Sequence, residues 1–380
     1  MNRLSVLPAL LGILLAFNLQ AQEARSFSVE AVGSFDEPWS LTFLPDGRIL
    51  VTEKKGNLRV VTQQGSQSRP IEGLPDVDYG GQGGLGDVIL HPDYADNGVI
   101  YLSYAETGVG DTRGAAVMRA VLELSERGGR LADAEVIWRQ YPKVLDDGHY
   151  GHRLAFDDDG YLWVSSGDRQ KFTPAQDMQS NMGKILRLED DGAIPADNPF
   201  VNYIDEDPLV DGVGPYDEIW SLGHRNPLGM AFDAEGELWV IEMGPAGGDE
   251  LNRIVRGANY GYPVVSNGDH YDGREMPDHD TRPEFTAPAI TWTPVISPGD
   301  LMIYGGDLFA DWRGNAFAAG LSSQSIVRIG FDGDGATELE RYDMGARIRS
   351  IEEAPDGSIW VLEDERGDSR GRLLKLTPRE

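Results

Sequence analysis

The chain has 380 residues, with 63 aspartates and glutamates against 33 lysines and arginines, and its formal net charge is -30 at pH 7. Such a charge repels nucleic acid and anionic lipid, and no basic tract offsets it, so we expect neither nucleic-acid binding nor membrane insertion. The chain contains no cysteine, which excludes disulfides, thiol nucleophiles, thiolate metal sites and a cysteine-linked lipid anchor. The abundant carboxylates are compatible with calcium, which prefers oxygen ligands.

The first residues have the pattern of a secretory signal peptide. Arg3 precedes an apolar run over residues 4–17, and a small-residue cleavage site ends at Ala21. The apolar run is shorter than the roughly 20 residues that a membrane-spanning helix needs. We therefore expect a signal peptide over residues 1–21, a mature chain that begins near Gln22, and a periplasmic or secreted location.

The rest of the chain repeats one pattern: an apolar strand, a turn that usually contains Asp-Gly, Asn-Gly or Glu-Gly, and a second strand rich in aromatic and β-branched residues. The six copies lie at residues 40–51, 88–101, 154–164, 230–240, 312–317 and 355–361. No segment has a helical period, and the 47 glycines and 22 prolines are spread along the whole chain. The repeats predict an all-β fold, a six-bladed β-propeller of four-stranded antiparallel blades, as a single domain over residues 22–380.

The two ends of the domain are predicted to pair. A propeller ring stays open unless a terminal strand completes the last blade. The segment Ser26–Val32 has a strand pattern and can pair beside the C-terminal segment Arg372–Leu376. We expect this pairing to close the ring.

Two glycine-rich loops carry candidate site residues. In residues 80–86 the glycines let the backbone approach a ligand, and Gln82 is the only long polar side chain, although the segment is equally compatible with a flexible turn. Residues 148–154 contain His149 and His152, and imidazole is the natural proton acceptor near neutral pH. The remaining histidines are expected to cap turns or face solvent: His91, His224, His270 and His279.

Charged and carbonyl groups mark three more segments. Arg225 beside Asn226 places a fixed cation next to an amide donor, which suits an oxygen that gains negative charge. In the loop 242–250, the carbonyls of Gly244 and Pro245 are typical calcium ligands, with Asp249 and other acids nearby. Arg347 and Arg349 are two residues apart, so on a strand both would point to the same side and could clamp carboxylates. Each segment taken alone is also compatible with an ordinary surface loop.

The order of these motifs resembles that of the soluble PQQ-dependent glucose and aldose sugar dehydrogenases, where PQQ is pyrroloquinoline quinone. The matching motifs lie at residues 81–86, 149–154, 182–188, 194–199, 223–227, 244–250 and 259–263. The resemblance runs from about Pro38 to the C-terminus and is closer to the compact aldose sugar dehydrogenases than to the larger soluble glucose dehydrogenase. The family is a six-bladed propeller, in agreement with the repeat count.

The resemblance implies an oxidoreductase that converts aldose sugars to lactones with PQQ and Ca²⁺ as cofactors, and that passes electrons to an external acceptor such as a cytochrome or a quinone. It implies that His149 is the general base for the anomeric hydroxyl while hydride passes to the quinone, and that Arg225 and Asn226 polarise the quinone carbonyl. Calcium would act as a Lewis acid. The resemblance also implies that Gln82 contacts the cofactor or the sugar and that the carbonyls of Gly244 and Pro245 bind calcium. By the same resemblance, Asp249 orients the site, and Arg347 and Arg349 bind the carboxylates of PQQ.

Three positions depart from the family pattern. Gly148 precedes the base where Asp or Asn is common, so the partner of the imidazole has to come from elsewhere, and Asp249 is a candidate. Ser322 stands where the glucose enzyme has a lysine that meets the cofactor, and Arg169 stands where it has a glutamine. These changes bear on PQQ affinity rather than on the type of reaction.

Two other functions are compatible with the fold. One is a propeller without cofactor that binds a glycan or a protein, since a fold by itself does not define a function. The other is a calcium-dependent, lactonase-type hydrolase. It is the less favoured, because such sites centre calcium on side-chain carboxylates and amides, whereas the candidate residues of this chain form a cationic, carbonyl-polarising set.

Overall fold

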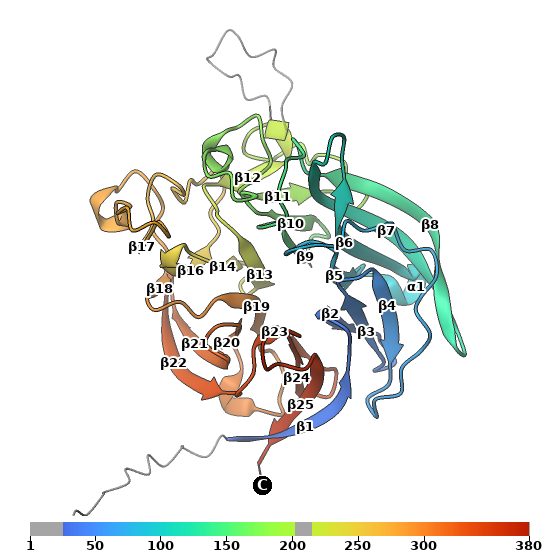
Figure 1. Ribbon diagram of the computed structural model, residues 1–380. Coiled ribbons are helices and arrows are strands. Elements are labelled where there is room, and N and C mark those ends of the chain that lie inside the picture. Colours follow the sequence, from blue (N-terminus) through green and yellow to red (C-terminus); the bar gives the residue numbers. More distant parts are fainter. Residues whose placement is uncertain (1–25, 202–214, 380) are drawn as a thin grey trace, which may run out of the picture.

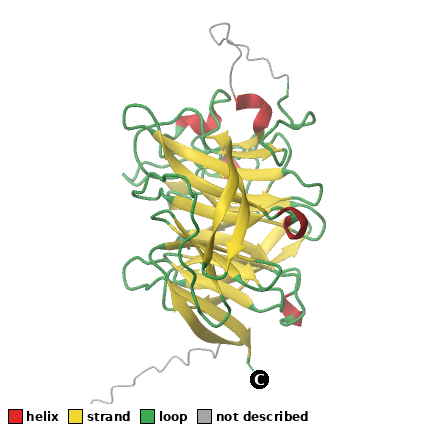
Figure 2. Ribbon diagram, turned by 90° about the vertical axis from the view of Figure 1, so that its right-hand side faces the viewer, coloured by secondary structure: helices red, strands yellow, loops and turns green. Residues whose placement is uncertain are grey.

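The computed structural model describes residues 26–201 and 215–379 and consists almost entirely of β-sheet. Six antiparallel sheets stand around a central axis, so the predicted six-bladed β-propeller is confirmed (Figure 1). Seen from the side, strands fill the body of the molecule and loops project from it (Figure 2). The expected signal peptide, residues 1–21, lies outside the described residues. None of the helices in the described ranges is long and apolar enough to cross a bilayer.

In the first three blades, the strands follow one another in chain order from the axis outward. Blade 1 contains β2 (Pro38–Phe43), β3 (Ile49–Glu53) and β4 (Asn57–Val61); blade 2 contains β5 (Leu85–Leu90), β6 (Val99–Thr107), β7 (Arg113–Ser125) and β8 (Gly128–Arg139); blade 3 contains β9 (Gly151–Phe156), β10 (Leu162–Ser166), β11 (Lys184–Leu188) and β12 (Ile219–Leu222).

The last three blades have the same arrangement, except that the outermost strand of blade 6 is the first strand of the chain. Blade 4 contains β13 (Pro227–Phe232), β14 (Leu238–Glu242), β16 (Asp249–Arg253) and β18 (Ile290–Trp292); blade 5 contains β19 (Pro298–Ile303), β20 (Ala316–Gly320), β21 (Ser325–Asp332) and β22 (Gly335–Asp343); blade 6 contains β23 (Ile348–Glu353), β24 (Ile359–Glu363), β25 (Arg372–Pro378) and β1 (Phe27–Ser34). The other described elements are the ribbon of β15 (Ala246–Gly247) and β17 (Gly268–Asp269), the helix α1 (Tyr94–Asn97), and 3-10 turns at Thr173–Gln176, Pro215–Glu218, His279–Thr281 and Ala310–Trp312.

The first and last blades show how the ring is completed. β1 pairs antiparallel with β25, with Val29 opposite Leu376, so the predicted pairing of the two ends is confirmed (Figure 1). Blade 1 has three regular strands, and an irregular segment lies in the fourth position. That segment forms a bridge from Gln67 to Val61 of β4, and the N–H of Ile71 donates to the carbonyl of Leu58 at 2.8 Å.

An aspartate ahead of the predicted turn fixes two of the repeated hairpins. In blade 3, the carboxylate of Asp157 accepts hydrogen bonds from the Tyr161 N–H at 2.8 Å and from the indole N–H of Trp163 at 2.8 Å. In blade 4, Asp233 accepts the equivalent hydrogen bond from the indole of Trp239, also at 2.8 Å. Each aspartate therefore ties the turn to a buried tryptophan of the same blade.

Four of the six predicted hairpins span the two inner strands of a blade, the sixth covers the turn before β24 and the start of β24, and the fifth in chain order was misplaced. The pattern at residues 312–317 covers a 3-10 turn at Trp312 and only the start of β20. The inner strand that pairs with β20 is β19, twelve residues upstream of it. This pair was missed because a long irregular connection with its own turn at Trp312 separates the two strands, whereas the connections of the other inner hairpins are shorter, including the one in blade 2 that contains α1.

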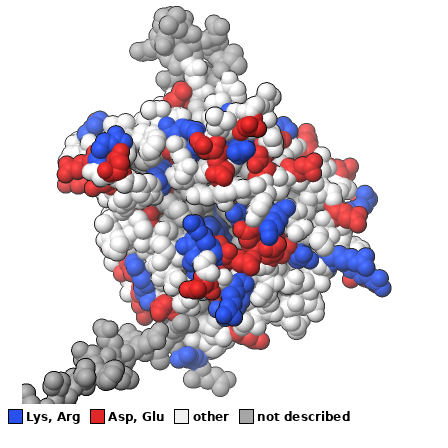
Figure 3. Space-filling model, in the orientation of Figure 1, with Lys and Arg blue, Asp and Glu red and all other residues white. Residues whose placement is uncertain are grey.

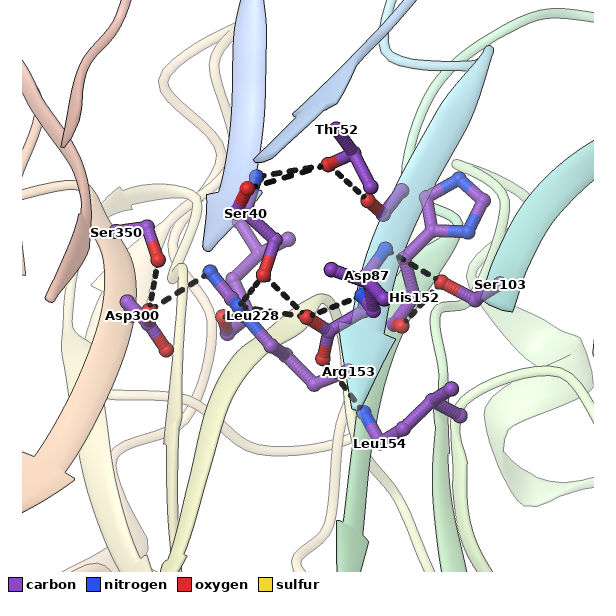
Figure 4. Close-up of polar contacts among 12 residues, drawn as sticks. Ser40, Thr52, Asp87, Ser103, His152, Arg153, Leu154, Leu228, Asp300 and Ser350 are labelled. Carbon is purple, nitrogen blue, oxygen red and sulfur yellow. Dashed lines mark hydrogen bonds and ion pairs between the residues drawn. The ribbon is translucent and has the colours of Figure 1, made fainter. Parts of the chain in front are cut away.

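The guanidinium of Arg153, on β9, lies buried at the axis where the inner strands converge (Figure 4). It forms ion pairs with Asp87 at 3.2 Å and with Asp300 at 3.1 Å. It also donates to the carbonyls of Leu228 at 2.6 Å and Gly299 at 2.8 Å. A buried charge needs partners on all its donors, and these four groups come from β5, β13 and β19.

Two serines extend this network to the remaining inner strands (Figure 4). The hydroxyl of Ser40, on β2, donates to Asp87 at 2.5 Å, and the hydroxyl of Ser350, on β23, donates to Asp300 at 2.7 Å. Burial raises the pKa of Asp300 to about 6, an effect that Arg153 opposes. The network therefore joins the inner strands of all six blades.

Replacing Arg153 by leucine should destabilise the protein by about 3 to 5 kcal/mol, because it leaves two buried carboxylates without their cation. The measurement is chemical denaturation at pH 7. Arg48→Leu is the matched control: its ion pair with Asp46 is solvent-exposed, so its loss should cost about 0 to 1 kcal/mol. Equal effects of the two substitutions would contradict a central role for Arg153.

Candidate active site

A pocket with a volume of about 630 Å³ opens where the inner strands begin, and its apolar lining includes Trp39, Leu228 and Leu321. Charged side chains of both signs line its walls: Lys54, Arg347, Arg349 and Arg366 are cationic, and Glu37, Asp147, Asp364 and Glu365 are acidic. Figure 3 shows one face of the molecule, on which charged side chains of both signs gather around a central hollow.

His149 is paired with a carboxylate beside this pocket. Its Nδ1 lies 2.7 Å from Oδ1 of Asp168, and both side chains are buried. Burial lowers the pKa of His149, and the charge of Arg225 also lowers it. The hydrogen bond to Asp168 opposes this shift. The imidazole is therefore neutral near pH 7, and with Nδ1–H donated to Asp168 its Nε2 is left as the proton acceptor.

The suggestion that Asp249 orients the imidazole was wrong, since Asp168 does so. Asp249 instead accepts hydrogen bonds from the N–H groups of Gly244 at 2.9 Å and Ser297 at 2.6 Å. Its carboxylate therefore shapes the loop that carries the expected calcium ligands. Burial raises the pKa of Asp249 to about 6.

The structure also explains Gly148. A Cβ atom at this position would lie 2.5 Å from the amide carbon of Gln170, so a side chain here would require the end of the Gln170 side chain to move. Gln170 lines the pocket, and its N–H donates to Asp168 at 3.0 Å. The turn that begins at Asp168 thus supplies the carboxylate for His149 and fills the space that a side chain at position 148 would need.

His152, the other histidine of this loop, has no carboxylate partner. It is 3% exposed, its ring stacks on Tyr150 and meets Trp39 edge-on, and neither ring nitrogen has a hydrogen bond within the described chain. Burial, together with the charge of Arg169, lowers the pKa of His152 to about 3. His152 is therefore neutral and, unlike His149, lacks a group that would stabilise a proton taken from a substrate.

The expectation that the remaining histidines cap turns or face solvent was wrong for two of them. His224 is fully buried, with Nδ1 2.9 Å from Glu242 and Nε2 2.9 Å from the hydroxyl of Ser221. His279 is also buried, and its Nε2 lies 3.0 Å from the carbonyl of Tyr260. Buried hydrogen-bond partners, which come from other segments, decide the position of both rings.

The other two histidines are half-buried, and His91 lies 2.9 Å from the N–H of Asp93 in a turn, as expected.

Arg225 and Asn226 are buried near the loop of His149, and each keeps a donor without a partner among the described residues. Asn226 accepts a hydrogen bond from the N–H of Gly151 at 3.3 Å, and Arg225 donates to the carbonyls of Met243 at 3.0 Å and Gly244 at 2.7 Å. Arg225 Nε and Asn226 Nδ2 have no partner among the described residues. Buried donors without partners are rare in folded proteins, so a ligand oxygen at this position would satisfy them.

Gln82 and the loop of Gly244 complete this wall of the site. The side-chain oxygen of Gln82 accepts a hydrogen bond from the N–H of His149 at 2.8 Å. Pro245, next to Gly244, lines a second cavity of about 410 Å³ that shares Met243 and Ser297 with the pocket. The described residues contain no group of three His, Asp or Glu side chains that could hold a metal ion, so a calcium ion at this loop would be held by backbone carbonyls and by its ligand.

Arg347 and Arg349 point to the same side, as their spacing predicts, although the strand register shifts between Ile348 and Ser350. Both guanidiniums contact the carboxylate of Asp364, at 3.0 Å and 3.3 Å. Burial raises the pKa of Asp364, but the charges of the two arginines outweigh this effect and lower it. The single carboxylate of Asp364 therefore pairs with two cations. Burial lowers the pKa of the Arg349 guanidinium. This arrangement fits an additional anionic ligand.

The two other departures from the family pattern lie away from the pocket lining. The Arg169 guanidinium is buried and donates to the carbonyls of Gly148 at 2.8 Å, Arg113 at 2.7 Å and Asp146 at 2.5 Å, so it supports the loop of the base. The hydroxyl of Ser322 donates to that of Ser297 at 2.8 Å.

Sequence reasoning missed a cation, Lys54. It lines the pocket and donates to the carbonyl of Gly81 at 2.9 Å, and burial lowers its pKa.

The fold and the site together define a β-propeller with a pocket on its axis, lined by charged side chains of both signs, and a histidine–aspartate pair beside it. The family model described as Glucose / Sorbosone dehydrogenase matches residues 35–375. The aldose sugar dehydrogenase YliI of Escherichia coli (strain K12) is 39% identical over 352 residues, which cover 90% of this chain and 91% of that protein. The chain belongs to the glucose/sorbosone dehydrogenase family, and as a member of it is an oxidoreductase.

Solved structures agree with this membership. The soluble aldose sugar dehydrogenase of E. coli in the apo-form has a TM-score of 0.84 and 38% sequence identity, and the match covers 93% of this chain and all of that one. The PQQ-bound form of the aldose sugar dehydrogenase of Streptomyces coelicolor has a TM-score of 0.75 and 27% identity, and covers 93% of this chain and 98% of that one.

The titration of His152 predicts a loss of stability in acid. Its pKa of about 3 in the folded state is below the value of about 6.5 in an unfolded chain, so the unfolded state takes up protons first as the pH falls. Stability should therefore be lost progressively below pH 6.5. Between pH 8 and pH 5, His152→Phe should lose about 2 kcal/mol less stability than the wild type, measured by denaturant unfolding. The same loss in both proteins would contradict the assignment.

Proposed function

We propose that this protein oxidises aldose sugars to lactones, with PQQ and Ca²⁺ bound in the axial pocket. The observation that carries the proposal is the pair of buried, unused donors on Arg225 and Asn226, which lie beside the His149–Asp168 pair at a pocket with clustered cations. A planar, polycarboxylate quinone matches this donor set in charge and in hydrogen-bonding capacity. The names of the relatives, which include a quinoprotein glucose dehydrogenase of Acinetobacter calcoaceticus at 30% identity, support the same reaction.

Each residue of the site has its own role in the proposed reaction. Nε2 of His149 accepts the proton of the anomeric hydroxyl, and Asp168 stabilises the resulting imidazolium through Nδ1–H. Arg225 and Asn226 donate to the oxygen on which negative charge develops. Arg347, Arg349 and Lys54 bind carboxylates. When bound, PQQ supplies the two-electron acceptor and calcium its Lewis acidity.

The supporting residues hold these groups in place. Gln82 fixes the backbone of His149 and lies where it can contact cofactor or sugar. Asp249 holds the loop whose carbonyls, at Gly244 and Pro245, are the proposed calcium ligands. We further propose export by cleavage near Ala21 and reoxidation by an external acceptor such as a cytochrome or a quinone.

The first test is a PQQ titration of the apoprotein in calcium, followed by cofactor absorbance and by dye reduction with sugars. We expect binding and activity with PQQ and Ca²⁺, and none with NAD or FAD. Arg349→Ala should weaken PQQ binding by about tenfold to a hundredfold, because a charge-assisted contact is lost. Lys55→Ala is the control, since this exposed cation pairs with Asp36. Failure of the wild type to bind PQQ would favour the cofactor-free propeller, and sugar oxidation with NAD alone would refute the cofactor assignment.

The second test concerns the base. His149→Gln should lower turnover by about a hundredfold to ten-thousandfold and leave PQQ binding nearly unchanged, because it removes only the proton acceptor. Stopped-flow dye reduction and PQQ titration measure the two quantities separately. If His152→Gln abolishes turnover and His149→Gln does not, the assignment of the base is wrong.

A further inference from the structure

The loop that carries His149 has a strained backbone. His149 itself has a φ of 49°, and Asp146 has a φ of 75°. Residues other than glycine rarely adopt such values, and the strain persists only where the surroundings fix it. Gln82 holds the middle of the loop, because its N–H donates to the carbonyl of Asp147 at 2.8 Å and its side-chain oxygen accepts from the N–H of His149 at 2.8 Å. The other carbonyls of the loop need donors of their own.

A single arginine supplies these donors. The guanidinium of Arg169 donates to the carbonyls of Gly148 at 2.8 Å and Asp146 at 2.5 Å. The backbone N–H of Arg169 donates to the carbonyl of His149 at 3.2 Å. Arg169 therefore binds three of the four consecutive carbonyls of residues 146–149. Because a guanidinium is planar and its donors form a rigid fork, these hydrogen bonds fix the direction of the carbonyls as well as their position.

Two further contacts anchor the guanidinium behind the loop. It donates to the carbonyl of Arg113, the first residue of β7 in blade 2, at 2.7 Å, and its central carbon lies 3.7 Å from the ring centre of Tyr150. Arg169 is 0% exposed, and no carboxylate of the described chain forms an ion pair with it. A buried cation without a counter-ion is costly, and a neutral side chain would avoid this cost. Fold stability alone therefore does not account for an arginine at this position.

The neighbouring residue in the chain holds the imidazole of the same histidine. Asp168 lies 2.7 Å from Nδ1 of His149, and Arg169 binds the backbone carbonyls on both sides of the peptide bond that leads into His149. The dipeptide Asp168–Arg169 thus fixes both the ring and the backbone of the proposed base.

We infer that Arg169 is a positioning residue for the proposed base: its guanidinium fork holds the loop 146–149 in the conformation that directs the imidazole of His149 toward Asp168. This inference rests on the proposed function. A misplacement of about 1 Å in a reacting group can cost about a hundredfold in rate. Arg169 does not line the pocket, so it acts on turnover and not on the binding of cofactor or sugar.

The experiment compares Arg169→Gln and Arg169→Lys with the wild type as PQQ- and calcium-loaded enzymes, with glucose as substrate and a small dye as acceptor. In both variants kcat should fall by about tenfold to a hundredfold, whereas KM and the affinity for PQQ should change by less than about threefold. Lysine keeps the charge but lacks the fork, so it should not restore turnover. Full turnover in Arg169→Lys, or a loss confined to KM, would overturn the inference.

Arg187 provides a matched control in the same blade. It is also buried, its guanidinium carbon lies 3.8 Å from the ring centre of Tyr161, and it pairs with Asp197 at 3.0 Å. Arg187→Gln should lower the midpoint of denaturant unfolding, as Arg169→Gln does, and leave kcat unchanged. An equal loss of kcat in the two glutamine variants would show that Arg169 acts only through overall stability.

A measurement on the apoprotein separates this inference from the proposed function. Long-range proton–nitrogen NMR of the histidine rings reports which ring nitrogen carries the proton, and the loss of signals in His149→Gln identifies those of His149. The wild type should show one fixed tautomer with the proton on Nδ1, because that nitrogen donates to Asp168. Arg169→Gln should show a mixture of tautomers, and Arg187→Gln should not.

If the wild type oxidises no sugar but these tautomers are found, the proposed function fails and the positioning role of Arg169 stands. The same fixed tautomer in Arg169→Gln, or a mixture already in the wild type, would overturn the positioning role whether or not sugars are oxidised.

Discussion

A single buried guanidinium, that of Arg153, joins the inner strands of the propeller at its axis. It pairs with Asp87 and Asp300, and Ser40 and Ser350 extend the contacts so that all six inner strands take part. Buried charges tolerate little displacement, because each unpaired group would cost several kcal/mol. The loops that follow from these strands are therefore presented at fixed positions around the pocket. The residue before Arg153 is His152, which lines the pocket, and His149, the proposed base, lies three positions further upstream.

Asp168 plays the same organising part within the site. One carboxylate oxygen meets His149 and the N–H of Gln170, and the other meets the N–H of Phe172. The orientation of the proposed base and the shape of the turn that follows Asp168 thus depend on one side chain.

Much of the fold was predictable, because a propeller is built from one local unit. The spacing of strand, turn and strand is a property of adjacent residues, and so is the aspartate that fixes a turn, as at Asp157. The pairing of the two ends followed from the need to close the ring. The prediction of a hairpin at residues 312–317 was wrong, because β19 and β20 are separated by an irregular connection that has no local hairpin signal. Asp168 was missed because the register of the third hairpin shifts between Val164 and Ser166, so the strand pattern does not show which residue comes to lie beside His149.

The amino-acid sequence predicted the blade count, the strand pairs of four inner hairpins and the residue types that the chemistry needs: an imidazole, paired arginines, an amide and a glycine-rich loop. These depend on neighbouring residues or on a spacing of two. Which groups meet depends on tertiary contacts: Asp168 and not Asp249 holds His149, His224 and His279 are buried, and Lys54 enters the pocket. Each of these depends on contacts between different blades or loops, and on which donors burial leaves without a partner, and no local pattern specifies either.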